Sequence, residues 1–92
     1  MTYEDKVLRA FRLDPPTLII WLDSHCVAGW HTDEPATAPL TCRSVGWVID
    51  ENETAVVLAP HITEEPLPQR LGEITIPKVA IVARKVLRLE GE

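Results

Sequence analysis

The sequence has no long apolar run. The longest uninterrupted one, Leu18 to Leu22, is far too short for a transmembrane helix or the core of a signal peptide. The first residues, Met1 to Lys6, are largely polar, and the chain contains no internal repeat and no low-complexity segment. We therefore expect a cytoplasmic protein without a targeting signal and without a membrane partner.

Cysteine is also scarce, since the chain has only Cys26 and Cys42. In a cytoplasmic protein two cysteines favour reduced thiols over a disulfide, and we interpret both as buried, small apolar side chains. Zinc is an alternative, with His31 as a third ligand and His61 or Asp33 as a fourth. The sequence contains no C-x-x-C and no H-x-x-x-H pair, so we expect no metal and no cofactor.

No catalytic signature is visible. Cys26 has histidines near it in the chain, but a thiol nucleophile also needs an orienting group and an oxyanion site, and neither is evident. A metal-dependent or thiol enzyme is therefore the weakest function class, and we expect a protein that is not an enzyme.

Basic residues are few and unevenly placed. Nine bases face fourteen acids, a net charge of −5, which argues against a general nucleic-acid coat. Residues 1–13 carry three bases and two acids, residues 14–69 one base and nine acids, and residues 70–92 five bases and three acids. The two ends therefore favour one basic patch on an acidic body.

The C-terminal bases form a candidate contact for an anion or for the acidic surface of a neighbouring subunit. The alternative is that they are solvated charges that protect a strand edge from aggregation. The candidate residues are Lys78, Arg84, Lys85 and Arg88.

Ninety-two residues allow one domain, 1–92, with an N-terminal helix in residues 1–14. Val7, Leu8 and Phe11 recur at helical spacing and indicate an apolar stripe that packs on the rest of the fold. Thr2 with Asp5 is typical of a helix N-terminus, and the Pro15-Pro16 pair ends the helix.

Strand-like patterns occupy residues 17–90. Residues 17–24 alternate between a fully apolar face and one that becomes polar, which predicts a strand. Residues 41–50 and 55–59 predict a hairpin. Within it, Gly46 predicts a bend where another backbone comes close. Trp47 shares a strand face with Val45 and Ile49, which favours a place in the core. Residues 60–72 predict a loop, and residues 73–76 and 79–89 two strands, with a bulge at Arg84-Lys85.

Five short, bent strands predict a mainly β fold, a small closed or nearly closed barrel with the helix over its open end. In this respect the chain resembles the Sm-like version of the SH3-type barrel. Ile76, Pro77, Lys78 and Ile81 stand where that family joins its last two strands by a turn reading roughly I-R-G-x-x-I.

A second resemblance is to a family of small uncharacterised phage and mobile-element proteins, over about residues 17–89. The matching strings are W-L-D-S-H at 21–25, G-W-H at 29–31, C-R-S-V-G-W-V at 42–48, V-V-L-A-P at 56–60 and G-x-x-x-I-P-K-x-x-I at 72–81. This resemblance implies an accessory protein in the host cytoplasm. The Sm-like one implies assembly through outer strands, with RNA or other nucleic-acid binding as the alternative function.

The long connection from His25 to Leu40 is irregular, and loops of this length are often functional. Its Trp30 offers a stacking surface next to His31, and Arg43 is the only base of the acidic middle. Trp30, His31 and Arg43 are therefore our candidate ligand-binding residues. The alternative is a loop pinned by its own tryptophan, with Arg43 paired to Asp23 or Asp33. We expect a homo-oligomer that binds a host protein or a small anionic ligand.

Overall fold

The computed structural model describes residues 1–90, so the predicted domain range 1–92 ends outside the described residues. Its helix, α1, spans Tyr3–Leu13. The amide of Asp5 donates to Oγ1 of Thr2 at 3.1 Å, and the amide of Thr2 donates to Oδ2 of Asp5 at 3.3 Å. This reciprocal capping box satisfies amides that the first turn leaves free, and it confirms the predicted helix start.

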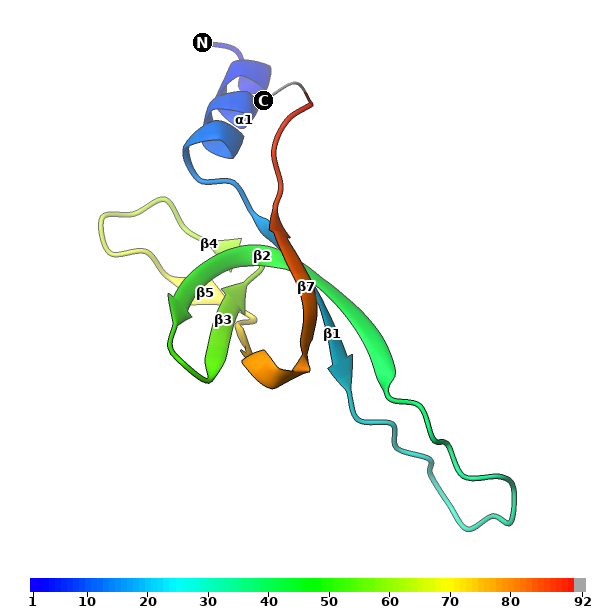
Figure 1. The fold of residues 1–92 in the computed structure, drawn as a ribbon. Helices are drawn as coiled ribbons and strands as arrows, with labels where there is room; N and C mark the ends of the chain where they lie inside the picture. The colour runs from blue at the N-terminus through cyan, green and yellow to red at the C-terminus, as the bar shows by residue number, and fades with distance from the viewer. Residues whose placement is uncertain (91–92) are drawn as a thin grey trace.

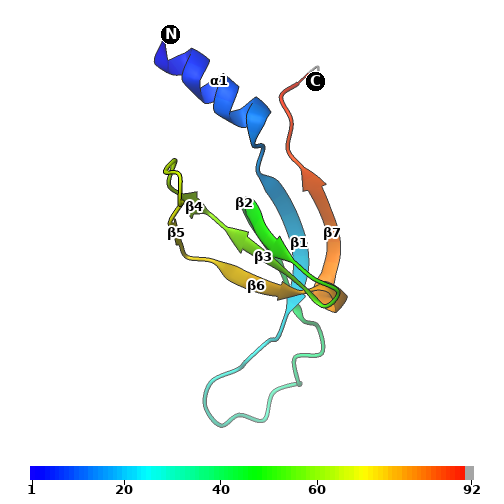
Figure 2. The same cartoon turned by 90° about the vertical axis from the view of Figure 1, so that its left-hand side faces the viewer.

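The helix does not lie on the sheet as predicted. No residue of α1 is buried, and Val7 of its apolar stripe is 66% exposed. Figure 2 shows α1 projecting past the end of the sheet. The physical reason is the Pro15-Pro16 pair, which favours an extended connection and carries the helix away from the strand that follows.

Five strands form one antiparallel sheet in the order β6-β3-β2-β1-β7 (Figure 1). They are β1 (Thr17–Asp23), β2 (Leu40–Glu51), β3 (Ala55–Ala59), β6 (Ile74–Pro77) and β7 (Ile81–Val86), with the 3₁₀ turn η1 (Lys78–Ala80) before β7. The mainly β fold, the N-terminal helix and the hairpin of β2 and β3 are therefore as predicted.

The core is small and lies on one face of the sheet. Its large, fully buried side chains are Ile19, Val56, Leu58 and Ile76, with Trp21, Ile74 and Ile81 packed against them. In β1 the inward face carries Ile19 and Trp21, whereas Leu22 of the fully apolar face is 39% exposed. Apolarity alone therefore does not reveal which face of β1 is buried.

Gly46 lies where β2 passes the backbone of β3. A Cβ at this position would lie 2.5 Å from the carbonyl oxygen of Ala59, which is closer than any side chain tolerates. The predicted close approach of another backbone is confirmed, and Gly46 is the residue that permits it.

The sheet is strongly rolled but is not closed into a barrel. Its edge strands, β6 and β7, make no ladder with each other, yet they are joined by only the three residues of η1. In a flat sheet four strand spacings would separate these edges by about 19 Å. A single 3₁₀ turn bridges only about 8 Å, so the sheet must curve to bring its edges together there.

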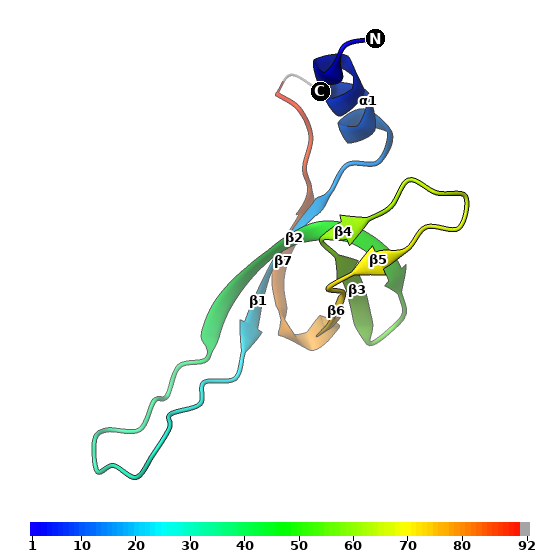
Figure 3. The ribbon, with the colours of Figure 1, turned by 180° about the vertical axis from the view of Figure 1, so that it is seen from behind.

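Residues 60–72 are not a plain loop. They contain a second, two-stranded sheet of β4 (His61–Ile62) and β5 (Arg70–Leu71), which Figure 3 shows beside the main sheet. The amide of Thr63 donates to the carbonyl oxygen of Gln69 at 2.9 Å and continues this ladder. The alternation that identifies longer strands is too short to be visible in two residues.

The bulge of β7 lies nearer its start than predicted. Ile20 pairs with Ala83 and Trp21 with Ile81, so Val82 is the extra residue. Arg84 and Lys85 are in regular register, opposite Ile19 and Leu18. The two adjacent charges do not disturb pairing because they point to opposite faces of the strand.

The described chain is elongated. It measures 61 × 32 × 27 Å, and its radius of gyration of 17.4 Å exceeds the value of about 12 Å expected for a compact domain of this length. Helix α1 and the loop of residues 24–39 extend from opposite ends of the sheet (Figure 1). With 11 residues α1 is too short to cross a membrane. Within residues 1–90 no helix is long and apolar enough to do so.

Candidate functional site

The predicted Trp30, His31 and Arg43 site is not assembled within residues 1–90. Trp30 and His31 lie on the loop that extends away from the sheet, and the indole of Trp30 is fully exposed. Arg43 lies on β2, opposite Ile20. None of the three side chains makes a hydrogen bond, ion pair or ring contact in this part of the chain. The alternative, a loop pinned by Trp30 with Arg43 paired to an aspartate, is not seen in residues 1–90, and ligand binding by Trp30, His31 and Arg43 stays a prediction.

The cysteines are not the two buried thiols that we predicted. Cys26 is an exposed free thiol on the loop, and Cys42 is a half-buried free thiol on β2. Cys42 lies opposite Trp21, which packs against the edge of the core, near the end of the sheet from which the loop leaves. Residues 1–90 contain no cluster of three or more histidine, cysteine or acidic side chains that could hold a metal ion.

Two of the four predicted C-terminal bases share one carboxylate. Arg84 donates to both oxygens of Glu51, at 3.0 and 3.2 Å, and Nζ of Lys78 lies 2.8 Å from Oε2. Hydrogen bonds from Arg84, and secondly from Lys78, lower the pKa of Glu51 from 4.5 to about 2. The cluster ties β2 to η1 and β7, so these bases act within the chain.

The other two bases, Lys85 and Arg88, are exposed and have no ion pair within residues 1–90. Arg88 lies in the segment after β7, which runs to the same end of the molecule as α1 in all three views (Figures 1, 2 and 3). Arg88 is therefore at the end of the molecule where α1 lies, whereas Lys85 is on β7 opposite Leu18, and Lys78 and Arg84 lie in the Glu51 cluster.

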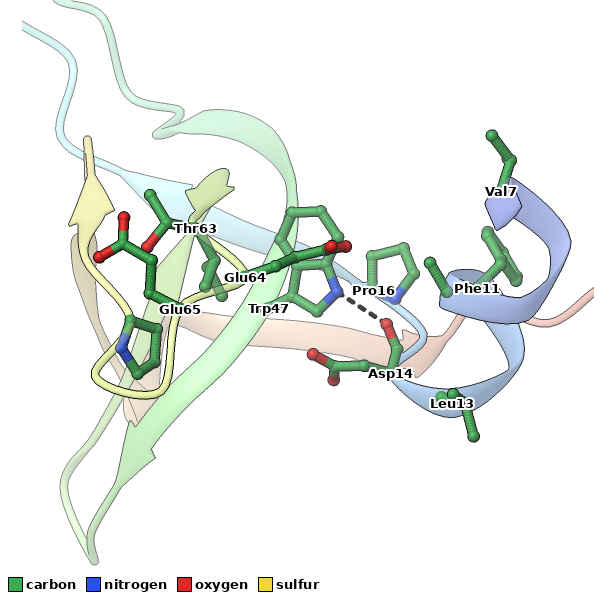
Figure 4. Close-up of a pocket in the computed structure, with 12 residues that line it drawn as sticks. Val7, Phe11, Leu13, Asp14, Pro16, Trp47, Thr63, Glu64 and Glu65 are labelled. Carbon is green, nitrogen blue, oxygen red and sulfur yellow. Dashed lines mark hydrogen bonds between the residues drawn. The ribbon is translucent and has the colours of Figure 1, made fainter. Parts of the chain in front are cut away.

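A groove with a volume of about 740 Å³ lies between α1 and the sheet (Figure 4). Three segments that are distant in the sequence build it: α1 with the residues after it, β2, and the tip of the hairpin formed by β4 and β5. The lining residues are Val7, Ala10, Phe11, Leu13, Asp14, Pro16, Trp47, Ile62, Thr63, Glu64, Glu65 and Pro68.

Trp47 lies at the centre of this groove and not in the core as predicted. Its Nε1 donates to the carbonyl oxygen of Asp14 at 2.8 Å, which fixes the indole beside the residues that follow α1. Figure 4 shows Trp47 between Phe11 and Pro16 on one side and Glu64 on the other. The face of β2 that carries Trp47 is opposite the face of Gly46, and only the latter face packs on the core.

The charge of the groove has one sign. Its ionisable lining residues are Asp14, Glu64 and Glu65, and no base lines it. The side chains of Glu64 and Glu65 make no hydrogen bond or ion pair within residues 1–90. Apolar walls with an acidic rim suit an occupant that is apolar and carries basic side chains beside its apolar surface.

Sequence reasoning missed this groove because its walls come from residues 7–16, 47 and 62–68, which no local pattern connects. The apolar stripe of α1 was visible, but it indicates only that something covers the helix. The acidic Glu64-Glu65 pair was visible too, and its position beside the helix depends on the path of the hairpin.

Comparison of this chain with protein-family models, with curated proteins and with solved structures finds no match. The groove and the exposed loop are therefore interpreted from their own residues.

Proposed function

We propose that this chain is a non-enzymatic accessory protein of a phage or mobile element that assembles with itself and binds a host protein. The observation that carries the proposal is the open apolar groove beside α1. Residues 1–90 contain only four large, fully buried side chains and so have little core, and yet the groove is left uncovered. Exposed apolar patches rimmed by polar residues are typical of interaction surfaces.

The Sm-like type of barrel belongs to this proposal. It is supported by the rolled sheet, the bend at Gly46 and the short turn η1 that joins the two edge strands. Both edges keep unpaired backbone groups, and such edges are available for contacts with another chain.

The loop of residues 24–39 supports the binding of a partner protein. Trp30 is fully exposed on it and Val27 is half-exposed, so the loop offers an apolar anchor far from the groove. Tryptophan is among the residues that contribute most to protein interfaces. A small anionic ligand has less support, because Lys78 and Arg84 already share Glu51.

Self-assembly is tested by the native mass of the purified protein. We expect a multiple of the 10.3 kDa chain mass by light scattering or native mass spectrometry at micromolar concentration. Elution volume alone is not sufficient, because an elongated monomer elutes early. A monomer under these conditions overturns the proposed function.

The contact with a host protein is tested by comparing wild-type bait with Trp30→Ala and with the matched loop control Thr32→Ala. We expect a host protein that is retained by the wild type and the control and lost by Trp30→Ala. Because Trp30 packs on nothing, the variant keeps its fold, which circular dichroism checks. Equal retention by all three baits, or no retained protein, counts against the loop as the binding element.

Nucleic-acid binding is the second candidate function. It is favoured by Lys85 and Arg88, which are exposed and unpaired within residues 1–90. Affinity for RNA would then fall steeply with salt and weaken in Lys85→Glu. No binding at low salt rejects this candidate.

A further inference from the structure

The groove beside α1 is half of a helix-packing site. Val7, Ala10 and Phe11 of the helix form one wall, and Trp47 and the β4 to β5 hairpin form the rest. Val7 is 66% exposed, whereas Leu8 and Phe11 are half-buried, so the chain covers the stripe only in part. A helix with a one-sided apolar face usually obtains its stability by burying that face.

The chemistry of the groove restricts its occupant. The walls are apolar and the rim carries Asp14, Glu64 and Glu65 without a compensating base. An acidic or neutral apolar segment would gain burial but would leave these carboxylates unmatched. An amphipathic segment with bases beside its apolar residues satisfies both requirements.

Helix α1 has this pattern. Its apolar residues Val7, Ala10 and Phe11 alternate with the bases Lys6, Arg9 and Arg12. The same helix that lines the groove therefore matches the groove chemically. A helix cannot fill the groove that it lines, so the matching helix belongs to a second copy of the chain.

We infer that two copies of this protein form a two-fold dimer in which α1 of each copy lies in the groove of the other. The inference rests on the proposed self-assembly and names its surface. The arrangement is isologous, so each contact occurs twice and the assembly closes as a dimer. Lys6 and Arg9 of one copy then face Glu64 and Glu65 of the other.

The polarity of α1 agrees with a two-fold arrangement. Its first turn is acidic, with Glu4 and Asp5, and its last turn is basic, with Arg12. Two antiparallel copies set their helix dipoles in opposite directions, which is the favourable arrangement.

The basic C-terminal segment is the competing occupant, but the chain already holds it. The amide of Leu87 donates to the carbonyl oxygen of Pro16 at 2.8 Å, and Leu87 and Leu89 are half-buried in their own chain. To enter the groove of a neighbour, this segment would first have to leave these contacts.

Charge reversal with complementary variants tests the dimer. Arg9→Glu places an acid against Glu64 and Glu65, and the double variant Glu64→Lys with Glu65→Lys places bases against Lys6 and Arg9. We expect each variant alone to dimerise about tenfold more weakly or worse, because like charges meet at both grooves. The exposed positions keep the fold, and glutamate is as good a helix former as arginine.

The decisive measurement is the native mass of an equimolar mixture of the two variants, one of them tagged. In the mixed dimer the unaltered groove of the Arg9→Glu copy receives an unaltered α1, and the other groove regains an opposite charge at position 9, so we expect the heterodimer to form in preference to either variant homodimer. Glu53→Lys in the turn between β2 and β3 is the matched control, and it leaves the dimer unchanged.

The outcomes separate this inference from the proposed function. If the wild type is an oligomer and Arg9→Glu keeps its mass, the helix contact is wrong and self-assembly stands. If Lys85→Glu dissociates the oligomer and Arg9→Glu does not, the C-terminal strand is the contact. Failure of the variant mixture to recover the dimer also overturns the inference, whereas a monomeric wild type overturns both.

Discussion

The two faces of β2 show how the same strand serves a core and an open groove. The Gly46 face packs on β3 and the buried residues Ile19 and Leu58, and the Trp47 face borders the groove beside α1. The apolar side chains are larger on the Trp47 face, which also carries Val45 and Ile49, than on the Gly46 face, and the two faces differ in burial. They differ because the strands of the sheet cover one face, whereas the helix that borders the other stands away from it.

This difference shows that the apolar residues of the chain fall into two groups, one in the core and one in the groove. The residues around Leu58 form the buried core, whereas Val7, Phe11 and Trp47 line the open groove. Substitutions in the two regions are therefore expected to have different consequences, and the comparison is testable.

The largest effect is expected for Leu58→Ala, which removes a fully buried side chain from the core. The free energy of unfolding should fall by about 2–5 kcal/mol, through lost burial and the cavity left behind. Urea unfolding, at a concentration low enough to keep the protein monomeric, measures it. Val7→Ala in the groove is the control and should change the monomer by less than about 0.5 kcal/mol. Equal losses at both sites would show that the groove is part of the core.

An intermediate effect is expected for Gly46→Ala, because the added Cβ would lie 2.5 Å from the carbonyl oxygen of Ala59. The strands β2 and β3 must move apart to make room for this Cβ, which should lower the free energy of unfolding by about 1–3 kcal/mol. The midpoint of urea unfolding measures the loss, and Val45→Thr, on the more exposed face of the same strand, should leave it nearly unchanged. An unaffected Gly46→Ala variant would contradict the close approach of the two strands.

The smallest effect is expected for the Glu51 cluster, which is partly exposed and screened by solvent. The pKa of the Glu51 carboxyl is lowered to about 2 in the folded chain, so the unfolded chain binds the proton more tightly. The contribution of Glu51 to stability is therefore present above about pH 4.5 and is lost as the pH falls towards 2.

Glu51→Gln tests this dependence. The variant should unfold at lower urea concentration than the wild type at pH 7, and the gap should narrow on acidification to pH 2 to 3 because the wild-type carboxylate is then protonated. Glu53→Gln, whose carboxylate has no ion pair within residues 1–90, is the control. A gap that does not change with pH would exclude the ion pairs as its cause.

Much of the fold was predictable because its signals are local. The Thr2 and Asp5 cap, the proline pair after α1 and the hairpin of β2 and β3 each depend on a few neighbouring residues. The bend at Gly46 was predictable for the same reason, since only glycine permits so close a backbone approach.

The candidate site was predicted poorly. Trp30 was correctly assigned to a loop, but Arg43 does not join it, and Trp47 borders the groove instead of the core. The type of a residue does not by itself determine the environment of its side chain. An aromatic side chain fits equally well in a core, in a groove or at the tip of a loop, and neighbouring residues do not distinguish these.

The sequence by itself determined the helix, the five strands of the main sheet and the uneven charge of the chain, because these follow from side-chain periodicity, glycine and proline geometry, and composition. Only the tertiary structure decided which face of β1 is buried, that Glu51 joins Lys78 to Arg84, and that α1, Trp47 and the acidic hairpin enclose one groove. Each of these depends on contacts between residues far apart in the chain, and such contacts arise from the packing of the whole sheet.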